Sequence, residues 1–316
     1  MKRSFAGRMN RWQSCNVSTA CLLLLLVLIL QSCASPSARL DQLADEQGFN
    51  SRFLKAGGFK LKVYENDRKL LQSTTATGDQ PERVLHVYLE GDGSPWRHRV
   101  VVMPDPTPRR PLMLQLMKID TQSSAYMGRP CYNGTYDEAP CQSDLWTSGR
   151  YSEAVILSMA SGLRALIKRH KADEVRLFGH SGGGALAMLL AERVTEVRRV
   201  ITIAGNLDID AWTTHHSYSP LYSSINPATR AGLDERVWQW HLLAAQDRVI
   251  PPQLVSSFIM DQPQASGFLF QGFSHGCCWD TVWPALLRAL AEDNPTLLPA
   301  RQFKFRAGSI SAAGSQ

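Results

Sequence analysis

The stretch Val175-Arg-Leu-Phe-Gly-His-Ser-Gly-Gly-Gly184 decides the fold, because an apolar strand runs directly into a G-x-S-x-G turn and then into a helix. A serine hydroxyl attacks an acyl carbon only when it is held clear of the backbone. A sharp strand-to-helix turn does this at the cost of strained dihedrals. Gly179 and Gly183 lack the Cβ that would collide within such a turn. The stretch therefore predicts Ser181 as a nucleophile.

Candidate strands and helices alternate around this unit. Strands are expected at 59–65, 84–90, 124–127, 175–178, 199–204, 238–244 and 267–271, and helices at 112–119, 153–171, 184–194, 253–259 and 280–291. This alternation predicts an α/β fold with a mostly parallel central sheet and helices on both faces. The first two strands are expected to pair antiparallel at an edge. Residues 209–235 interrupt the alternation and predict a short lid-like insertion over the site.

Two later strand ends carry the partners that a nucleophilic serine needs. Asp247 follows the strand at 238–244, and His275 follows the strand at 267–271 and precedes the last helix. Imidazole exchanges a proton near neutral pH, and an aspartate holds it in the required tautomer. We therefore expect His275 to be the base and Asp247 its orienting acid. The alternative for Asp247 is an aspartate that only starts a turn.

Three other histidines have weaker assignments. His180 adjoins the serine, but its side chain is expected to point elsewhere and to support the site indirectly. His215 and His216 lie in the insertion, where they either contact substrate or cap a turn; we favour the turn.

With Ser181, Asp247 and His275 in that chain order, residues 58–295 resemble the α/β-hydrolase superfamily, most closely at 175–192, 243–252 and 270–279. The resemblance implies an acyl-enzyme mechanism on a small acyl substrate, without cofactor or metal. An ester is favoured over a thioester or amide, although fold alone does not choose among them. The segments Tyr126–Cys131 and Trp146–Tyr151 resemble features of lipoprotein hydrolases from proteobacteria.

Acyl transfer also needs hydrogen-bond donors for the oxyanion. One is expected to be the backbone N–H of Gly182, directly after the nucleophile. The second is expected at Asp92, in a turn that resembles the His-Gly turn of lipases and esterases but carries Glu90 in place of histidine. The Asp92 carboxylate would oppose a developing negative charge, so we expect it to turn away or to pair with Arg97 or Arg99.

The N-terminus has the order of a secretory signal: basic residues up to Arg11, then the apolar run Cys21–Leu30. The run is short for a permanent transmembrane anchor, which is the alternative. Leu30-Gln-Ser-Cys33 resembles the lipobox of bacterial lipoproteins, which implies lipidation of Cys33 and durable attachment to a membrane. Ala34 is compatible with the outer membrane, and we expect the domain to face the periplasm.

Loss of residues 1–32 lowers the formal charge from +6 to +2, because that segment holds four basic and no acidic residues. The remainder shows no basic face or zinc-knuckle spacing, so no nucleic-acid partner is expected. The expected organisation is a lipoprotein signal at 1–32, a tether at 33–57 with room for a short helix, a hydrolase domain at 58–297 and a frayed tail at 298–316.

Four cysteines lie beyond Cys33, and an exported chain tends to pair them. We expect a disulfide between Cys131 and Cys141. Cys277 and Cys278 either join each other or cross to the loop at 131–141, and these alternatives stay open. Their spacings fit no zinc ribbon, so no metal is expected.

The favoured function is a lipid-anchored serine hydrolase, an esterase or lipase-like enzyme. The alternative is a non-enzymatic envelope lipoprotein that uses the same scaffold as a binding module. The sequence favours the enzyme, because a binding module needs no serine, aspartate and histidine in this order.

Overall fold

The central sheet has the strand order β1-β2-β7-β4-β8-β9-β10-β11-β12, with β3 paired to β4 beside this path. The computed structural model describes residues 34–66, 68, 72–73 and 82–303, and the segment from Pro36 onward forms a compact unit by itself. The strands of the sheet are β1 (Asn50–Ala56), β2 (Phe59–Glu65), β3 (Gln72–Ser73), β4 (Glu82–Leu89), β7 (Ser124–Met127), β8 (Glu174–His180), β9 (Val197–Ile203), β10 (Trp238–Ala244), β11 (Ala265–Phe270) and β12 (Arg301–Phe303).

The run from β7 to β11 is parallel, and the strands at the two edges are antiparallel. A separate two-stranded hairpin is formed by β5 (Trp96–Arg97) and β6 (Val101–Val102). The helices are α2 (Pro36–Glu46), α3 (Leu112–Ile119), α4 (Glu153–His170), α5 (Gly182–Ala191), α6 (Ile209–His215), α7 (Ser256–Asp261) and α8 (Trp279–Ala291). Short 3-10 turns lie at Ser143–Trp146, Pro227–Thr229, Pro252–Leu254 and Pro295–Leu297.

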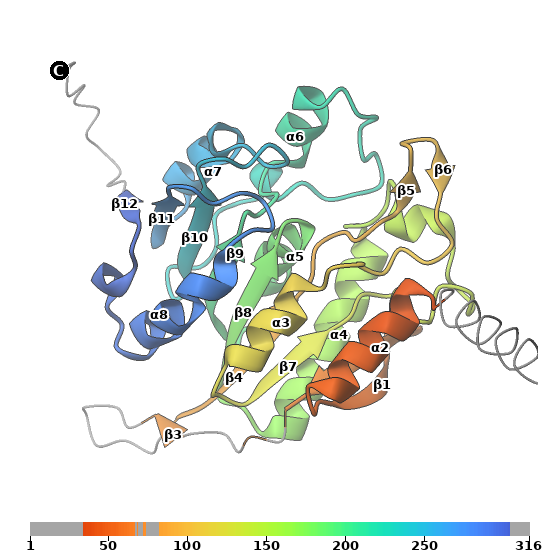
Figure 1. Cartoon of the computed structure of the whole chain (residues 1–316), viewed down its shortest axis with the longest axis horizontal. Helices are drawn as coiled ribbons and strands as arrows, with labels where there is room; N and C mark the ends of the chain where they lie inside the picture. The colour runs from red at the N-terminus through yellow and green to blue at the C-terminus, as the bar shows by residue number, and fades with distance from the viewer. Residues whose placement is uncertain (1–33, 67, 69–71, 74–81, 304–316) are drawn as a thin grey trace, which may run out of the picture. The chain divides into compact units, whose positions relative to one another are not determined.

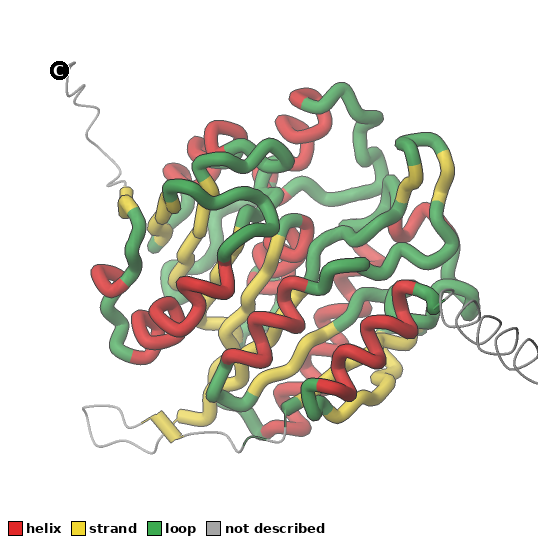
Figure 2. Tube along the Cα trace, viewed as in Figure 1, coloured by secondary structure: helices red, strands yellow, loops and turns green. Residues whose placement is uncertain are grey.

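Helices cover both faces of the sheet (Figure 1). One core gathers the apolar faces of α4, α5 and α7, and the other gathers those of α2, α3 and α8. Side chains of one strand alternate between the two cores: Val87 of β4 packs with α4 and α5, whereas Tyr88 packs with α3 and α8. Both faces are therefore buried, as the predicted α/β class requires. The loops after the parallel strands gather at the carboxyl edge of the sheet (Figure 2).

One predicted strand pairing is wrong. The strand at 59–65 does lie near an edge, but it pairs antiparallel with β1 and with β7. The predicted strand at 84–90 is β4, which lies inside the sheet and runs parallel to β7 and β8. The reason is that Asn50–Ala56, which we did not predict as a strand, forms a hairpin with β2 through Gly57 and Gly58 and takes the edge position.

The predicted tether at 33–57 is also wrong over most of its length. Helix α2 buries Leu40 and Ala44 in the core shared with α3 and α8. Its first turn is fixed by Ser37, whose backbone N–H and hydroxyl both donate to the buried carboxylate of Asp105 at 3.0 and 2.8 Å. A short helix within this segment was expected, but its packing into the core and the strand that follows it were not, because both depend on contacts with distant elements.

The predicted tail at 298–316 needs a smaller correction. Arg301–Phe303 forms β12, which pairs antiparallel with β11. The Phe303 ring occupies the space above Gly267, where a built Cβ would come within 2.2 Å of it. Residues 304–316 lie outside the described residues, as do the predicted signal at 1–32 and Cys33. Among the helices described, none is both long and apolar enough to cross a bilayer.

Candidate active site

Ser181 stands at the turn between β8 and α5 with φ 53° and ψ −121°, a left-handed conformation that is costly for a residue with a side chain. The glycines on either side make the turn possible. A Cβ on Gly179 would lie 2.3 Å from the Gly183 carbonyl oxygen, and one on Gly183 would lie 2.3 Å from the Leu89 carbonyl oxygen. The Ser181 carbonyl accepts from Asn206 N–H at 2.9 Å. The strained turn predicted from the sequence is therefore present.

Asp247 and His275 meet at the carboxyl edge of the sheet. Nδ1 of His275 lies 2.8 Å from Oδ2 of Asp247, and the Asp247 side chain is fully buried. The other carboxylate oxygen, Oδ1, accepts from the backbone N–H groups of Val249 and Ile250 at 2.7 and 2.9 Å. These bonds aim Oδ2 at the imidazole, so Nδ1 carries the proton and Nε2 is left to accept one.

Burial lowers the pKa of His275, and the hydrogen bond that His275 donates to Asp247 opposes that effect only in part. The nearby His180 lowers the pKa of His275 further. His275 is therefore neutral at pH 7, which is the form that a general base requires.

His180 connects the histidine loop to the serine turn. Its Nε2 lies 2.9 Å from the backbone oxygen of His275, and the two rings are 4.8 Å apart between centroids. Since His180 directly precedes Ser181, this bond brings the base loop beside the nucleophile. The indirect role expected for His180 fits this geometry.

The turn after β4 lies against the serine. A Cβ on Gly91 would come within 3.3 Å of both His180 Nδ1 and Ser181 Cβ. Glu90, which replaces the histidine of related turns, accepts from the backbone N–H of Met113 at 2.9 Å and of Gly91 at 3.1 Å. Its carboxylate thus caps the first turn of α3, where the positive end of the helix dipole favours an anion.

Asp92 sits next to Gly182 in this turn. A Cβ on Gly182 would lie 1.9 Å from Asp92 Oδ1 and 2.3 Å from Tyr151 Oη. The backbone oxygen of Asp92 accepts from the Tyr132 hydroxyl at 3.0 Å, which fixes the peptide. Gly182 begins α5, so its N–H has no carbonyl four residues earlier within the helix to bond. Gly182 and Asp92, which carry the two expected oxyanion donors, are therefore packed closely against each other.

The carboxylate of Asp92 is neutralised by two buried arginines. Arg129 Nη1 lies 2.8 Å from Oδ1 and Arg150 Nη1 lies 3.0 Å from Oδ2, while the Tyr151 hydroxyl donates to the same carboxylate. Burial alone would raise the pKa of Asp92, but the two guanidinium charges outweigh it and lower the pKa to about 2. The cluster of one aspartate and two arginines carries a net positive charge.

The predicted partners of Asp92, Arg97 and Arg99, are wrong. Both lie on the exposed β5–β6 hairpin, whereas Arg129 follows β7 and Arg150 precedes α4. Parallel strands bring their carboxyl ends to one edge, so a residue after β7 reaches the turn after the neighbouring β4. The sequence analysis missed both arginines as site residues, although each lies in one of the two quoted segments.

The insertion at 209–235 contains α6 and forms hydrogen bonds to the loop that carries Asp247. Trp212 Nε1 donates to the backbone oxygen of Val249 at 3.0 Å, and His216 Nε2 lies 2.8 Å from the same oxygen. The His216 ring also stacks on Tyr218. His216 directly follows α6, and His215 lies in the last turn of that helix.

The part of the chain that the structure describes contains two disulfides. Cys131 and Cys141 are joined as predicted, with Cα atoms 5.4 Å apart. Of the alternatives left open, Cys277 and Cys278 are joined to each other. This adjacent pair lies two and three residues beyond His275, and Cys278 directly precedes α8 with a left-handed φ of 79°.

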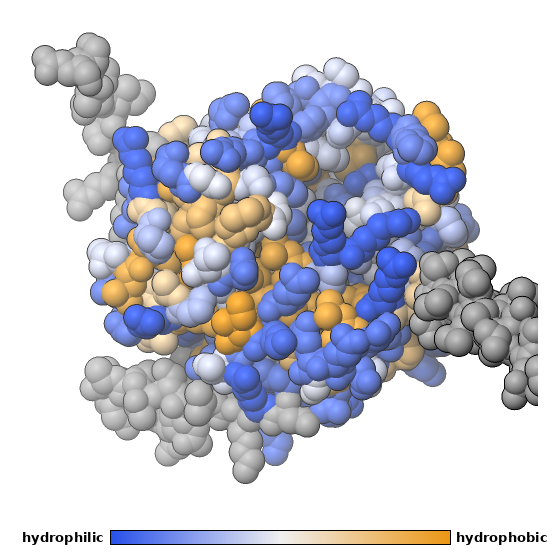
Figure 3. Space-filling model, in the orientation of Figure 1, coloured by the Kyte–Doolittle hydropathy of each residue, from blue (hydrophilic) through white to orange (hydrophobic). Residues whose placement is uncertain are grey.

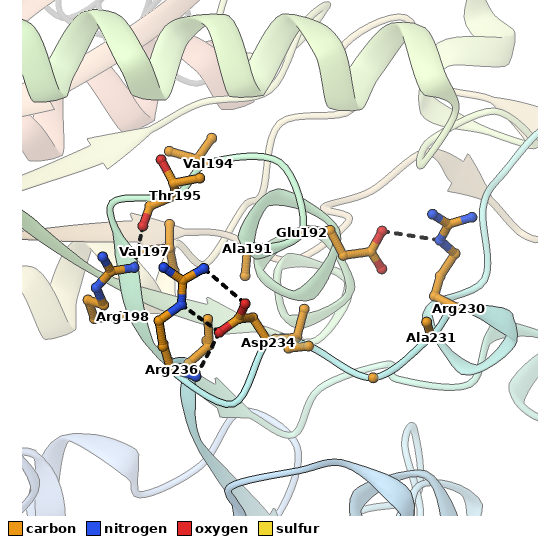
Figure 4. A pocket seen from close by; sticks show the side chains of 13 residues that line it. Ala191, Glu192, Val194, Thr195, Val197, Arg198, Arg230, Ala231, Asp234 and Arg236 are labelled. Atoms are coloured by element: carbon orange, nitrogen blue, oxygen red, sulfur yellow. Dashed lines mark hydrogen bonds and ion pairs between the residues drawn. The ribbon is translucent and has the colours of Figure 1, made fainter.

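A hollow elsewhere on the surface, shown in Figure 4, is lined by none of the proposed catalytic residues. It is lined by the end of α5, the start of β9 and residues 230–237, and its carboxylates are engaged with arginines, Asp234 with Arg236 and Glu192 with Arg230. Because the start of a parallel strand lies at the amino edge, this hollow is separate from Ser181.

No model of a known protein family matches the sequence, and no curated protein matches it. The structure is similar to puromycin hydrolase, with a TM-score of 0.52 and 18% identity over 79% of this chain and 39% of that one. It is similar to a puromycin-hydrolyzing peptidase of Mycobacterium tuberculosis, with a TM-score of 0.53 and 16% identity over 83% of this chain and 41% of that one. Esterase Pf2001 of Pyrococcus furiosus gives a TM-score of 0.51 at 12% identity, over 81% of this chain and 94% of that one.

The chain has the α/β-hydrolase fold, and the expected fold class is confirmed. It spans about two fifths of the length of puromycin hydrolase. At these identities the comparisons concern the fold alone.

Proposed function

We propose that this chain is a serine hydrolase that cleaves an ester, thioester or amide bond of a small acyl substrate, with Ser181 as nucleophile. Two observations support the proposal: Ser181 is strained at the β8–α5 turn, and Asp247 holds the His275 imidazole in the required tautomer. His180, the neighbour of Ser181 in the chain, links the two loops, since its Nε2 lies 2.9 Å from the backbone oxygen of His275. A binding module, the alternative, would gain nothing from that strain.

In the proposed reaction, Oγ of Ser181 attacks the acyl carbon as Nε2 of His275 takes the hydroxyl proton. The oxyanion accepts hydrogen bonds from the backbone N–H groups of Gly182 and Asp92. The protonated Nε2 then gives its proton to the leaving group, and an acyl-serine remains. Water attacks the acyl-serine as His275 takes its proton, and the imidazolium then gives that proton to Oγ of Ser181 as the acid leaves, which restores the free enzyme.

An ester is the favoured substrate. The proteins with similar folds include an esterase and a puromycin-hydrolyzing peptidase, so both ester and amide substrates belong in the test. We also propose that Cys33 is lipidated and holds the domain on the bacterial outer membrane, facing the periplasm. Two disulfides in the folded domain support an oxidising compartment.

A fluorophosphonate probe tests the catalytic proposal, because it reacts with an activated serine. We expect one labelled peptide, which carries Ser181, and loss of labelling in Ser181→Ala. Ser158→Ala is the matched control, since this buried serine of α4 donates to the Ala56 backbone oxygen and has no role in the mechanism. Absence of labelling in the folded parent protein would favour the binding module.

The anchor is tested separately with Cys33→Ser in the full chain. We expect the variant to lose radiolabelled fatty acid and to leave the membrane fraction, while its esterase activity per folded molecule is unchanged. Recovery of the variant in the membrane with residues 21–30 still attached would show an uncleaved apolar anchor instead.

A further inference from the structure

The β5–β6 hairpin exposes apolar side chains that the core does not need. Trp96, Val100 and Val101 are 42%, 75% and 50% exposed. The base of the hairpin is fixed separately: Val102 packs against the cluster of Cys131, Tyr132 and Trp146. Figure 3 shows apolar surface where the hairpin projects at the upper right. Trp96 pairs with Val102 and Val101 pairs with Arg97, so the exposed apolar side chains lie on both faces of the hairpin. Apolar side chains exposed together on one projecting hairpin indicate a binding surface.

Basic side chains accompany this tip. Arg97, His98 and Arg99 lie between its apolar residues and are exposed. The guanidinium carbon of Arg99 lies 5.2 Å from the Tyr218 ring centroid, which places the hairpin beside the insertion at 209–235. Tryptophan with arginine is the combination that sits at a bilayer surface, where the indole enters the interface and the cations meet anionic headgroups.

The start of the folded unit emerges close to the hairpin. Ser37 of α2 is bonded to Asp105, which lies four residues beyond Val101. Cys33 lies four residues before Ser37. Four residues span at most about 14 Å and seven residues at most about 25 Å. The proposed lipid attachment therefore lies within about 14 Å of this buried hydrogen bond, and the tip of the hairpin at 98–100 lies within about 25 Å of it. Both can reach one planar membrane.

We infer that the β5–β6 hairpin is a second membrane contact that docks on an anionic lipid surface, with Trp96, Val100 and Val101 in the interface and Arg97 against the headgroups. The inference rests on the proposed lipid anchor for its choice of occupant. Trp96 lies three residues beyond Gly93, so docking brings the turn that carries Asp92 close to the membrane surface.

Vesicle co-sedimentation of a chain that begins at residue 34 tests the hairpin without Cys33. This chain contains the whole compact unit and both of its cores. We expect binding to vesicles of phosphatidylethanolamine and phosphatidylglycerol at 3:1, and weaker binding to phosphatidylcholine. The triple variant Trp96→Ser/Val100→Ser/Val101→Ser should bind at least about tenfold more weakly. Arg97→Gln should bind the anionic vesicles about fivefold more weakly and leave phosphatidylcholine binding unchanged.

The matched control is Trp238→Ser/Met260→Ser, which removes exposed apolar side chains at the start of β10 and the end of α7. It should bind as the parent does, and circular dichroism checks that every variant is folded. The inference is overturned if the folded parent does not sediment with anionic vesicles, or if the triple variant binds as well as the parent. Hydrolysis of soluble p-nitrophenyl acetate, measured on the same samples, reports separately on the proposed catalysis and should not change in the hairpin variants.

Discussion

The carboxylate of Asp92 lies directly against the α-carbon of Gly182, where a Cβ would come 1.9 Å from Oδ1. The two residues that we assign to the oxyanion thus determine each other's position. The backbone of Gly182 can approach only because it has no side chain, and Asp92 is held there by Arg129 and Arg150.

Gly182→Ala is expected to lower kcat by at least about a hundredfold, because the new methyl group displaces Asp92 and one oxyanion donor contributes about 2.7 to 4 kcal/mol. Ester hydrolysis by the purified variant measures the effect. The matched control is Gly276→Ala, since a Cβ there meets nothing within 4 Å. Equal rates for the two variants would contradict the assignment of Gly182.

Asp92→Asn is expected to lower the free energy of unfolding by about 3 to 5 kcal/mol at pH 7, because it leaves two buried guanidinium groups without their carboxylate. Urea denaturation measures the change. The control, Asp234→Asn, removes an exposed partner of Arg236 and should change little.

The effect of Asp92→Asn should depend on pH. The pKa of about 2 in the folded protein lies below the ordinary aspartate value of 3.8, so the stabilisation is present above pH 3.8 and is lost as the pH falls toward 2. The difference in unfolding free energy between parent and variant should therefore shrink over that interval. A difference that is constant from pH 6 to pH 2 would contradict the ionic role of Asp92.

The acid limb of kcat/KM for ester hydrolysis should have its midpoint below 6.5. Burial lowers the pKa of His275, and the base must be unprotonated to accept the serine proton. A pH–rate profile at constant ionic strength measures this midpoint. A midpoint above 6.5 would mean that another group is the base or that the loop is more open in solution.

Asp247→Asn should lower kcat by about 10⁴-fold while the fold is retained, because an amide can present its NH₂ group to Nδ1 and reverse the tautomer of His275. Single-turnover hydrolysis measures the acylation step. Asp280→Asn is the control, since this exposed aspartate lies in the first turn of α8 and outside the proposed mechanism.

Removal of one disulfide should mainly affect stability, and removal of the other should mainly affect activity. Cys131→Ser/Cys141→Ser should lower the free energy of unfolding by about 2 to 4 kcal/mol, because the bond limits the unfolded chain. Cys277→Ser/Cys278→Ser should mainly lower kcat, because that pair lies in the loop of His275. Non-reducing peptide mapping identifies the bonds, and a crosslink between the two pairs would contradict both expectations.

Local patterns were sufficient for much of the fold and for the candidate triad. The strands Phe59–Glu65, Ser124–Met127 and Trp238–Ala244 have the predicted bounds, because alternation and apolar runs are properties of neighbouring residues. The strained turn at Ser181 could be predicted because the glycines that it needs, Gly179 and Gly183, lie only two residues away on either side. Asp247 and His275 could be found because each follows a strand, and the ends of parallel strands meet at one edge.

Only the tertiary structure decided which charges meet at Asp92 and which segments complete the sheet. Arg129 and Arg150 are remote from Asp92 in the chain, and their contact depends on β7 lying next to β4. Likewise, α2 and β12 have little local signal, because their stability comes from Leu40 packing under α3 and α8 and from Phe303 covering Gly267. Such contacts form only after the sheet has brought distant segments together, so no window of sequence contains the interaction that specifies them.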